Sequence, residues 1–467
     1  MVISLARRRG CAKSGPSDGS NRHKLAAAGV ALCMTVAATG CGSDSNNEGS
    51  ASTDSTSSAA SSTPAPASST ESVANSTVVS GSNPPGSTAE TTDRTGQTIK
   101  IGLVNEDNGP FTFPEFRFGA EVAFQRINDN GGINGAQIEL VSCSVDLTPE
   151  SSVDCANQLV EADVAAAFIG IDLTSDAALP VYQEAGIPYI TSNNWGEIQA
   201  TAEGAHLLHV ATEAAFVSAF ELASTLGAKK LAFLYENNPA NVNNVENIMP
   251  PISETYGIPF VAVSVDGAAP DWTAAVASAN AQGAELMYGQ NSEPGCTAMV
   301  KAIRASNFDG PIGAGLCSKF QFDLGEDANG VYTVMDQLQP SAKGSAPATI
   351  AAHLKEYEQL MSAAGHDEYI EGYAVWPYGA ANELGTVLST ISGDINGASV
   401  EAALDADVTI PGWLGPDLNC GAEQWPSSPN SCTATIGVFQ TETDGTTVVR
   451  NEVIPFFDAY KKLQSKG

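Results

Sequence analysis

Residues 98–141 have the sequence TIKIGLVNEDNGPFTFPEFRFGAEVAFQRINDNGGINGAQIELV, and they are the most informative stretch of the chain. The run 98–104 is rich in β-branched residues and predicts a strand. The helix that follows presents one apolar face, formed by Phe116, Gly119, Val122, Ala123 and Ile127. It ends at Asn130-Gly131, a pair that favours the left-handed conformation in which helices stop. A second strand is predicted at 137–142.

The same alternation of strands and helices continues to residue 213 and restarts after it. Repeated units of this kind predict parallel, doubly wound sheets. About 370 residues are too many for one such sheet, so we expect an α/β protein with two doubly wound lobes. The further helices are expected at 151–162, 176–185, 214–226, 242–256, 272–281 and 371–391, and the further strands at 164–170, 187–191, 229–235, 258–265, 284–289, 435–440 and 446–450.

The first forty residues have the features of an export signal. Six of them are positively charged, and residues 25–39 form an uncharged apolar run that is shorter than the roughly 20 residues needed to span a bilayer. The run ends in Ala38-Thr39-Gly40-Cys41, which resembles the lipobox of bacterial lipoproteins. We therefore expect a signal peptide at 1–40 and a lipid-modified Cys41, the alternative being an ordinary secretory signal with Cys41 as a spare thiol.

Residues 41–97 consist mainly of Ser, Thr, Ala, Asn, Gly and Pro, with almost no large apolar side chains. Such a segment cannot bury enough apolar surface to fold. We expect it to be a disordered linker with a mean reach of roughly 40 Å, which would hold the folded domain away from the cell envelope.

The charge balance excludes one class of partner. Without residues 1–40 the chain keeps 15 Lys and Arg against 52 Asp and Glu. Nucleic acid is not an expected partner, because phosphate binding depends on basic side chains. The acidity favours a soluble monomer near a surface.

Six cysteines remain after the signal peptide and Cys41 are set aside. An even number in an exported chain indicates disulfides, and six cysteines allow fifteen pairings. The six fall into three close pairs along the chain, and no CxxC or neighbouring histidine favours zinc, so no metal site is expected. The predicted bonds are Cys143 to Cys155, Cys296 to Cys317, and Cys420 to Cys432.

The order and spacing of several segments resemble the type I periplasmic binding proteins of the branched-chain amino acid and amide transporters. The similarity covers roughly 98–462; besides 101–141 it includes AAAFIGIDLTSDAALPVYQEAGIPYITSNN at 165–194 and ELMYGQNSEPGCTAMVKAIRASNFDGPIGAG at 285–315. The resemblance implies a ligand trapped between two lobes that are joined by three crossing segments. The lobes are expected at 98–213 plus 338–434 and at 214–337 plus 435–462, with crossings near 210–214, 336–341 and 433–440.

In the first lobe, the resemblance places ligand contacts in three loops that follow strands. The loop after 164–170 contains Asp172, Thr174 and Ser175, and its hydroxyls and free amides are expected to hold a ligand carboxylate, with N-capping of helix 176–185 as the alternative. Asp172 would instead suit an ammonium or amide group. The other expected contacts are Asn193, Asn194 and Trp195 after the fourth strand, and Phe111 and Phe113 as an apolar wall, unless these rings are part of the core.

In the second lobe, the matching loops depart from the family pattern. Members that bind amino acids often have an aromatic residue near Asn291 and an acid near Cys317 to hold the ammonium group. This chain has neither, although Glu293 is close in sequence. A branched-chain amino acid is therefore in doubt, and an amide, a short acid or an aromatic compound gains support. The expected contacts are Tyr235, Asn237, Asn291, Ser292 and Ser318.

Together these features predict a lipid-anchored, extracytoplasmic substrate-binding component of an ABC importer, held at the outer face of the cytoplasmic membrane. Its expected partners are a small organic solute, the permease subunits and the membrane, and no cofactor is expected. A secreted hydrolase is disfavoured, since no GxSxG, HExxH or Walker motif occurs. His206 and His209 lie three apart and are expected on a solvated face. The alternative is a ligand sensor that acts through a separate partner. Transport is favoured over sensing, because such receptors usually continue into a membrane helix and an intracellular domain, which the sequence up to Gly467 does not show.

Overall fold

The computed structural model describes residues 92–458, apart from positions 110, 111, 195, 197, 268, 426 and 444–447. The predicted signal peptide and Cys41, nearly all of the predicted linker, and the predicted contacts Phe111 and Trp195 lie outside the described residues. Within the described part of the chain, no helix is both long enough and apolar enough to cross a membrane.

The first lobe is built on a sheet of five parallel strands in the order β2-β1-β3-β4-β5. All six residues of the middle strand, β3, are buried, as expected for a strand covered on both faces. The strands are β1 Thr98–Glu106, β2 Gln137–Val145, β3 Ala166–Ile171, β4 Tyr189–Thr191 and β5 Ala205–Leu207.

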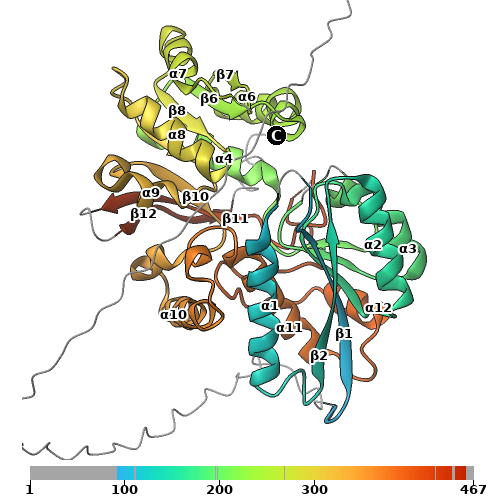
Figure 1. Cartoon of the computed structure of the whole chain (residues 1–467). Coiled ribbons are helices and arrows are strands. Elements are labelled where there is room, and N and C mark those ends of the chain that lie inside the picture. The colour runs from blue at the N-terminus through green and yellow to red at the C-terminus, as the bar shows by residue number, and fades with distance from the viewer. Residues whose placement is uncertain are drawn as a thin grey trace, which may run out of the picture. The chain divides into compact units, whose positions relative to one another are not determined.

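Helices cover both faces of this sheet. One apolar core lies between the sheet and α1, α10 and α11, and a second lies between the sheet and α2 and α3. Figure 1 shows α1 and α11 side by side. Gly119 permits this close approach, because a Cβ there would collide with the carbonyl oxygen of Ala374. The helices are α1 Pro114–Asp129, α2 Pro149–Glu161, α3 Leu179–Ala185, α10 Ala348–Ala363, α11 Val375–Thr390 and α12 Gly397–Leu404.

The second lobe has a seven-stranded sheet in the order β12-β11-β10-β9-β8-β6-β7. The five strands from β10 to β7 are parallel, whereas β11 and β12 form an antiparallel hairpin at one edge. The two doubly wound α/β sheets predicted from the sequence are therefore confirmed, with an antiparallel hairpin added to one of them. The strands are β6 Leu231–Glu236, β7 Phe260–Val265, β8 Leu286–Gly289, β9 Ile312–Ala314, β10 Tyr332–Met335, β11 Thr435–Thr443 and β12 Val448–Asp458.

The second sheet also has an apolar core on each face. One core includes residues of α4 and α6, and the other includes residues of α7, α8 and α9. Figure 1 shows α7 and α8 on one side of β6 and β8, with α4 and α6 also in this lobe. The helices are α4 Thr212–Leu226, α5 Pro239–Asn243, α6 Met249–Tyr256, α7 Trp272–Ala281, α8 Glu293–Arg304 and α9 Phe320–Leu324.

Two predicted helices are interrupted, and proline explains both interruptions. The helix expected at 242–256 consists of α5, a π turn at Asn244–Ile248 and α6, which has Pro250 and Pro251 in its first turn. The helix expected at 176–185 begins as a 3₁₀ turn, and α3 starts only at Leu179, next to Pro180. A proline has no N–H to continue the hydrogen-bond ladder of a preceding helix, so a new helix begins at each of these sites.

Three segments pass between the two sheets. Residues 208–211 join β5 to α4, residues 336–339 follow β10, and residues 430–434 lead into β11. The third segment lies beside the end of β5, because Leu207 forms a parallel bridge to Ser431 and backbone hydrogen bonds to Asn430 and Cys432. The first and third segments are thus held together by backbone hydrogen bonds.

The three disulfides predicted from spacing are present in the structure: Cys143 to Cys155, Cys296 to Cys317, and Cys420 to Cys432. The first ties β2 to α2. The second ties the start of α8 to the loop after β9. The third holds the last connecting segment to the loop that precedes it. Each bond restrains a local loop, as the short separations in sequence imply.

Candidate functional site

Open α/β sheets bind ligands beyond the carboxyl ends of their parallel strands. In the first lobe these strand ends include Glu106, Ile171 and Thr191, and in the second lobe they include Glu236, Gly289 and Ala314. The described residues that we predicted as ligand contacts lie in or next to the loops that begin at these positions. We call these segments the strand-end loops.

Asp172, Thr174 and Ser175 form a hydrogen-bonded group after β3. The Asp172 carboxylate is buried and accepts hydrogen bonds from Ser152 Oγ (2.9 Å) and the Thr174 amide (2.9 Å). Burial raises the pKa of Asp172, although these hydrogen bonds partly offset the rise. The hydroxyls do not cap a helix: that of Ser175 donates to the Asp172 carbonyl (2.7 Å), and that of Thr174 can donate to the Thr148 carbonyl (3.1 Å).

Asn193 and Asn194 connect the loop after β4 to the first connecting segment. The Asn193 amide donates to the Val210 carbonyl (3.2 Å), and the Asn194 side-chain oxygen accepts from the Thr212 amide (3.1 Å) and hydroxyl (3.0 Å). The other polar atom of Asn193, Oδ1, is buried and has no hydrogen-bond partner. Ser192 Oγ, in the same loop, is likewise buried without a hydrogen-bond partner.

In the second lobe, Glu236 at the end of β6 forms hydrogen bonds with two of the predicted ligand contacts, Asn291 and Ser292. Its backbone amide donates to Asn291 Oδ1 (2.8 Å), and its carboxylate accepts from the Ser292 hydroxyl (2.8 Å) and amide (2.9 Å). Ser292 is also the N-cap of α8. Tyr235 stacks on Phe233 with the ring centroids 5.3 Å apart, and Asn237 is exposed.

Glu293 supplies the acid that the sequence lacks beside Cys317. Its carboxylate accepts hydrogen bonds from the Ser318 amide (3.0 Å), the Ser318 hydroxyl (3.1 Å) and the Lys319 amide (2.8 Å). Burial raises the pKa of Glu293 despite these contacts. The sequence shows Glu293 close to Asn291 but not beside Cys317; in the structure the start of α8 brings its carboxylate to the loop that follows Cys317.

Aromatic rings on α1 and at the start of α11 form a cluster that the sequence did not single out. The Tyr373 ring lies 5.7 Å from Phe116 and stacks on Trp376 at 5.2 Å, both between centroids. Phe113, a predicted contact, packs edge-on against Phe116 at 6.3 Å. We call Phe113, Phe116, Tyr373 and Trp376 the Tyr373 cluster.

Acids from both lobes lie close to this cluster. Burial raises the pKa of the Tyr373 hydroxyl well above its ordinary range, and the nearby charges of Glu293, Glu115 and Glu236 raise it further. Burial likewise raises the pKa of Glu115, whose carboxyl also feels the charges of Lys319 and Glu293. Charged groups of both lobes therefore act on the turn before α11, where the two lobes approach each other.

Gly372 provides direct evidence of this approach. Its φ of 114° favours glycine, and a Cβ there would lie 3.3 Å from Lys319 Cε and 3.6 Å from Ser318 Oγ. The backbone of Gly372 exchanges two hydrogen bonds with the side chain of Gln339, in the second connecting segment. The turn before α11 is thus fixed by a connecting segment on one side and contacts the second lobe on the other.

Glu106, the last residue of β1, is a further group that the sequence analysis missed. Its side chain is fully buried, and neither carboxylate oxygen has a hydrogen-bond partner. Burial and the charge of Asp172 raise its pKa to about 7; the amides of Leu173 and Leu147 partly offset the rise but do not reach hydrogen-bond geometry.

His209, in the first connecting segment, joins a buried network with two acids. Its Nε2 is 3.0 Å from Glu383 Oε2 on α11, and its Nδ1 is 4.0 Å from Asp336 Oδ2 in the second connecting segment. Trp376 of the Tyr373 cluster donates to Asp336 Oδ1 (3.1 Å). The expectation of a solvated face for His206 and His209 was wrong: they lie on β5 and in the following segment, and both are buried.

His206 has a separate environment. Its Nε2 lies 3.1 Å from Glu401 Oε2, and a carboxylate oxygen of Asp405 lies within 4.8 Å of both groups. Glu401 and Asp405 are one helical turn apart near the end of α12, and Asp405 is exposed. The hydrogen bond between His206 and Glu401 accounts for this arrangement without a metal ion.

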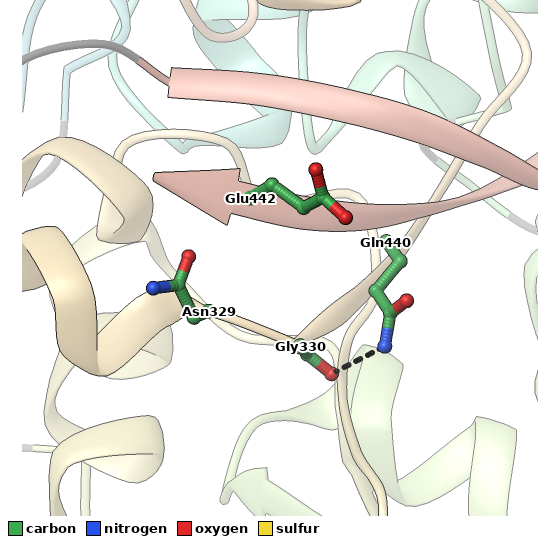
Figure 2. Close-up of a pocket in the computed structure, with 4 residues that line it drawn as sticks. All are labelled: Asn329, Gly330, Gln440 and Glu442. Carbon is green, nitrogen blue, oxygen red and sulfur yellow. Dashed lines mark hydrogen bonds between the residues drawn. The ribbon is translucent and has the colours of Figure 1, made fainter. Parts of the chain in front are cut away.

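A surface hollow of about 450 Å³ lies away from the strand-end loops. Figure 2 shows its lining residues Asn329, Gly330, Gln440 and Glu442, with Gln440 Nε2 donating to the Gly330 carbonyl (3.4 Å). Gly330 precedes β10, so the hollow is at the amino end of the parallel strands. It is therefore at the opposite edge of the sheet from the candidate site.

A comparison with known protein families gives a match that agrees with this two-lobed fold. Residues 98–425 match the model of a family described as periplasmic binding protein, and the chain therefore belongs to the periplasmic binding protein family. Its two α/β sheets joined by three segments are those of the type I fold of this family.

Similar proteins include several solute-binding proteins. An amino acid binding protein of Pseudomonas aeruginosa is 27% identical over 233 residues, which cover 48% of this chain and 58% of that protein, so the match spans little more than half of the relative. The branched-chain amino acid transporter substrate binding protein LivJ of Streptococcus pneumoniae, solved with isoleucine, is 18% identical with a TM-score of 0.59, covering 76% of this chain and 100% of its own.

A second solved structure broadens the range of ligands among the structural neighbours. The fatty acid ABC transporter substrate-binding protein of Thermomonospora curvata is 14% identical with a TM-score of 0.63, covering 80% of this chain and 96% of its own. These likenesses show the fold. Because one neighbour is named for an amino acid transporter and another for fatty acid, they do not indicate a ligand for this chain.

Proposed function

We propose that this protein is the extracytoplasmic substrate-binding component of an ABC importer and closes its two lobes around a small organic solute. The observation that carries the proposal is the close approach of the two lobes at Gly372, where a Cβ would lie 3.3 Å from Lys319 Cε and 3.8 Å from Glu293 Oε1 of the second lobe. In a two-lobed protein of this family, such a meeting point is where a solute would be enclosed.

The three connecting segments support a hinge between the lobes. Two of them contribute to the network of His209 and Asp336, and the lobe boundaries proposed from the sequence, 98–213 plus 338–434 and 214–337 plus 435–462, place their crossings near these segments. Closure would change the backbone angles of these few residues and leave each sheet intact.

The sequence also supports attachment to the outer face of the cytoplasmic membrane. Ala38-Thr39-Gly40-Cys41 follows an uncharged run of the length of a signal peptide, and the polar segment 42–97 would act as a tether. We propose that acyl chains on Cys41 hold the domain near its permease, since each buried methylene contributes about 0.8 kcal/mol to membrane binding.

A thermal-shift screen of residues 92–467 against amino acids, amides, amines, short acids and aromatic acids tests the binding function. One solute class should raise the free energy of unfolding by about 2.7 kcal/mol at 100 times the dissociation constant. Tyr373→Ala should remove this gain, whereas Tyr332→Ala, on β10 and outside the candidate site, should retain it. The proposal fails if every class leaves the domain unchanged while an added substrate is turned over.

The anchor is tested by replacing Cys41 with serine in cells of an expressing bacterium. The Cys41→Ser protein should leave the membrane fraction and incorporate no labelled fatty acid, because serine has no thiol to acylate. Cys33→Ser, inside the apolar run of the predicted signal, is the matched control and should stay attached. Membrane attachment of the Cys41→Ser protein would contradict the lipid anchor.

A further inference from the structure

The loop that follows β9 contacts the first lobe. In this loop, residues 316–319, the ammonium group of Lys319 lies 5.1 Å from the ring centroid of Tyr369. A Cβ at Gly372 would lie 3.3 Å from Lys319 Cε and 3.6 Å from Ser318 Oγ. Tyr369 and Gly372 belong to the segment between α10 and α11 of the first lobe, whereas Lys319 and Ser318 belong to the second. We call residues 316–319 the β9 loop.

Bonds within the second lobe hold the β9 loop in a fixed shape. A disulfide joins Cys317 to Cys296 on α8, and the Cys317 carbonyl accepts a hydrogen bond from the Thr333 hydroxyl (3.0 Å). The next two backbone amides donate to the Glu293 carboxylate, also on α8, at 3.0 and 2.8 Å. Leu316 has a φ of 59°, a left-handed conformation that a residue with a Cβ keeps only where its surroundings impose it. The second lobe therefore shapes this loop by its own bonds.

The surface that receives the β9 loop is fixed as well. The Tyr369 ring packs against Phe118 of α1, with the centroids 5.3 Å apart, and the Tyr369 carbonyl accepts from the Tyr357 hydroxyl (3.2 Å). Gly372 exchanges hydrogen bonds of 3.1 and 3.0 Å with the side chain of Gln339. Neither backbone segment has to be ordered when the two surfaces meet, so the contact costs little conformational entropy. Such a contact can stabilise one arrangement of the lobes.

We propose that the β9 loop is a clasp between the lobes. Lys319 on the Tyr369 ring and the close packing at Gly372 hold the lobes together, and the disulfide between Cys296 and Cys317 keeps the loop in the shape that this contact requires. The inference rests on the proposed closure of the two lobes and assigns the control of that closure to one loop. It does not depend on which solute is bound.

Hydrogen–deuterium exchange of residues 41–467 without solute tests the clasp. Lys319→Ala should raise the exchange rates of residues 366–373 in the first lobe and of the connecting segment 208–211 roughly two- to fivefold. A cation over a partly exposed aromatic ring shifts an equilibrium by about this factor, and a connecting segment bends when the lobes separate. The buried strand β3 should keep its exchange rate, because each sheet moves as a unit.

Lys230→Ala is the matched control for Lys319→Ala. The Lys230 ammonium group donates to the Gln282 carbonyl (2.9 Å) and so bonds within the second lobe, and this variant should exchange as the wild type does. A rise confined to 366–373 in Lys319→Ala would reveal a local contact that does not hold the lobes, and wild-type rates in both segments would reveal no effect at all. Either result overturns the clasp.

A second pair of variants tests the packing at Gly372. Gly372→Leu should raise exchange in segment 208–211, because its side chain would take the space beside Lys319. Gly131→Leu is the control: its φ of 97° is close to the 114° of Gly372, but among the described residues no atom lies within 4 Å of an added Cβ. Equal exchange of the two variants in 208–211 would trace the effect to backbone strain and overturn the clasp.

The role of the disulfide is tested by replacing Cys296 and Cys317 together with serine. This double variant should show the exchange pattern of Lys319→Ala. Serine at both Cys143 and Cys155 removes a disulfide inside the first lobe and should leave segment 208–211 unchanged. The same rise in both double variants would contradict a specific role in the clasp. A solute that still stabilises a protein whose lobes ignore Lys319→Ala would leave the binding function intact, whereas the absence of any stabilising solute would remove that function itself.

Discussion

Replacing His209 with glutamine is expected to lower the free energy of unfolding by about 3 to 5 kcal/mol at pH 6, the range found when one partner of a buried ion pair is removed. His209, Glu383 and Asp336 are all at most 1% exposed. Glutamine cannot carry the charge that faces the two carboxylates. Urea-induced unfolding followed by circular dichroism measures the change.

The cost of the His209 substitution should depend on pH. Burial lowers the pKa of His209, but the charge of Glu383, its hydrogen bond and the charge of Asp336 outweigh burial, so the pKa lies above its ordinary value of 6.5. A raised histidine pKa stabilises the folded state below pH 6.5, and this stabilisation is lost as the pH rises through the folded-state pKa. The difference between wild type and His209→Gln should therefore be larger at pH 6 than at pH 9.

His206→Gln is the matched control for this substitution. Its partner Glu401 has 30% of its side chain exposed, so water screens the pair and the cost should be about 1 kcal/mol or less. Equal losses for the two variants, or a loss for His209→Gln that does not change between pH 6 and pH 9, would show that the buried network contributes no specific electrostatic stabilisation.

Replacing Glu106 with glutamine is expected to stabilise the protein by about 3 kcal/mol at pH 8. Burial and the charge of Asp172 raise the pKa of Glu106 from 4.5 to about 7, and each pKa unit corresponds to about 1.4 kcal/mol. For an acid with a raised pKa, the penalty is absent below pH 4.5 and is complete once the pH has risen past 7. Glutamine cannot ionise, so it avoids this penalty.

The gain from Glu106→Gln should disappear near pH 4.5, where the carboxyl is largely neutral in the folded state. Unfolding in urea at pH 4.5, 6 and 8 gives the three values needed. Glu139→Gln, on the exposed side of the neighbouring strand β2, is the control and should change stability little at any of them. A destabilised Glu106→Gln protein at pH 8 would mean that the ionised carboxylate is held by interactions stronger than its burial cost.

Much of the fold could be predicted because its signals are local. The strand at 98–104, the apolar face of α1 and its end at Asn130-Gly131 all depend on residues within a few positions of one another. Some exceptions were also local in origin: β5 has only three residues, too few for a periodic pattern, and Pro180 and Pro250 divide helices that were predicted as continuous. Other elements were not predicted at all, including the helices α8, α10 and α12 and the strands β9 and β10.

The candidate site was harder to predict from the sequence, because its residues are far apart in the chain. The loops that contain the predicted contacts could be located, since the carboxyl ends of parallel strands share one edge. The partners of each side chain could not. Tyr373 meets Phe116 of α1 across more than 250 positions. The sequence shows which polar side chains exist, but only the packed structure shows which of them already form hydrogen bonds within the protein.

The sequence by itself determined the alternation of strands and helices, the family resemblance and the three cysteine pairs, because each depends on spacing along the chain. It also predicts the export signal and Cys41. Only the tertiary structure decided that Glu293 lies beside Ser318, that His209 lies between Glu383 and Asp336, and that Glu106 is buried next to Asp172. The reason is physical: charge, burial and hydrogen bonding act over a few ångströms in space, and sheets and helices bring together residues that are hundreds of positions apart.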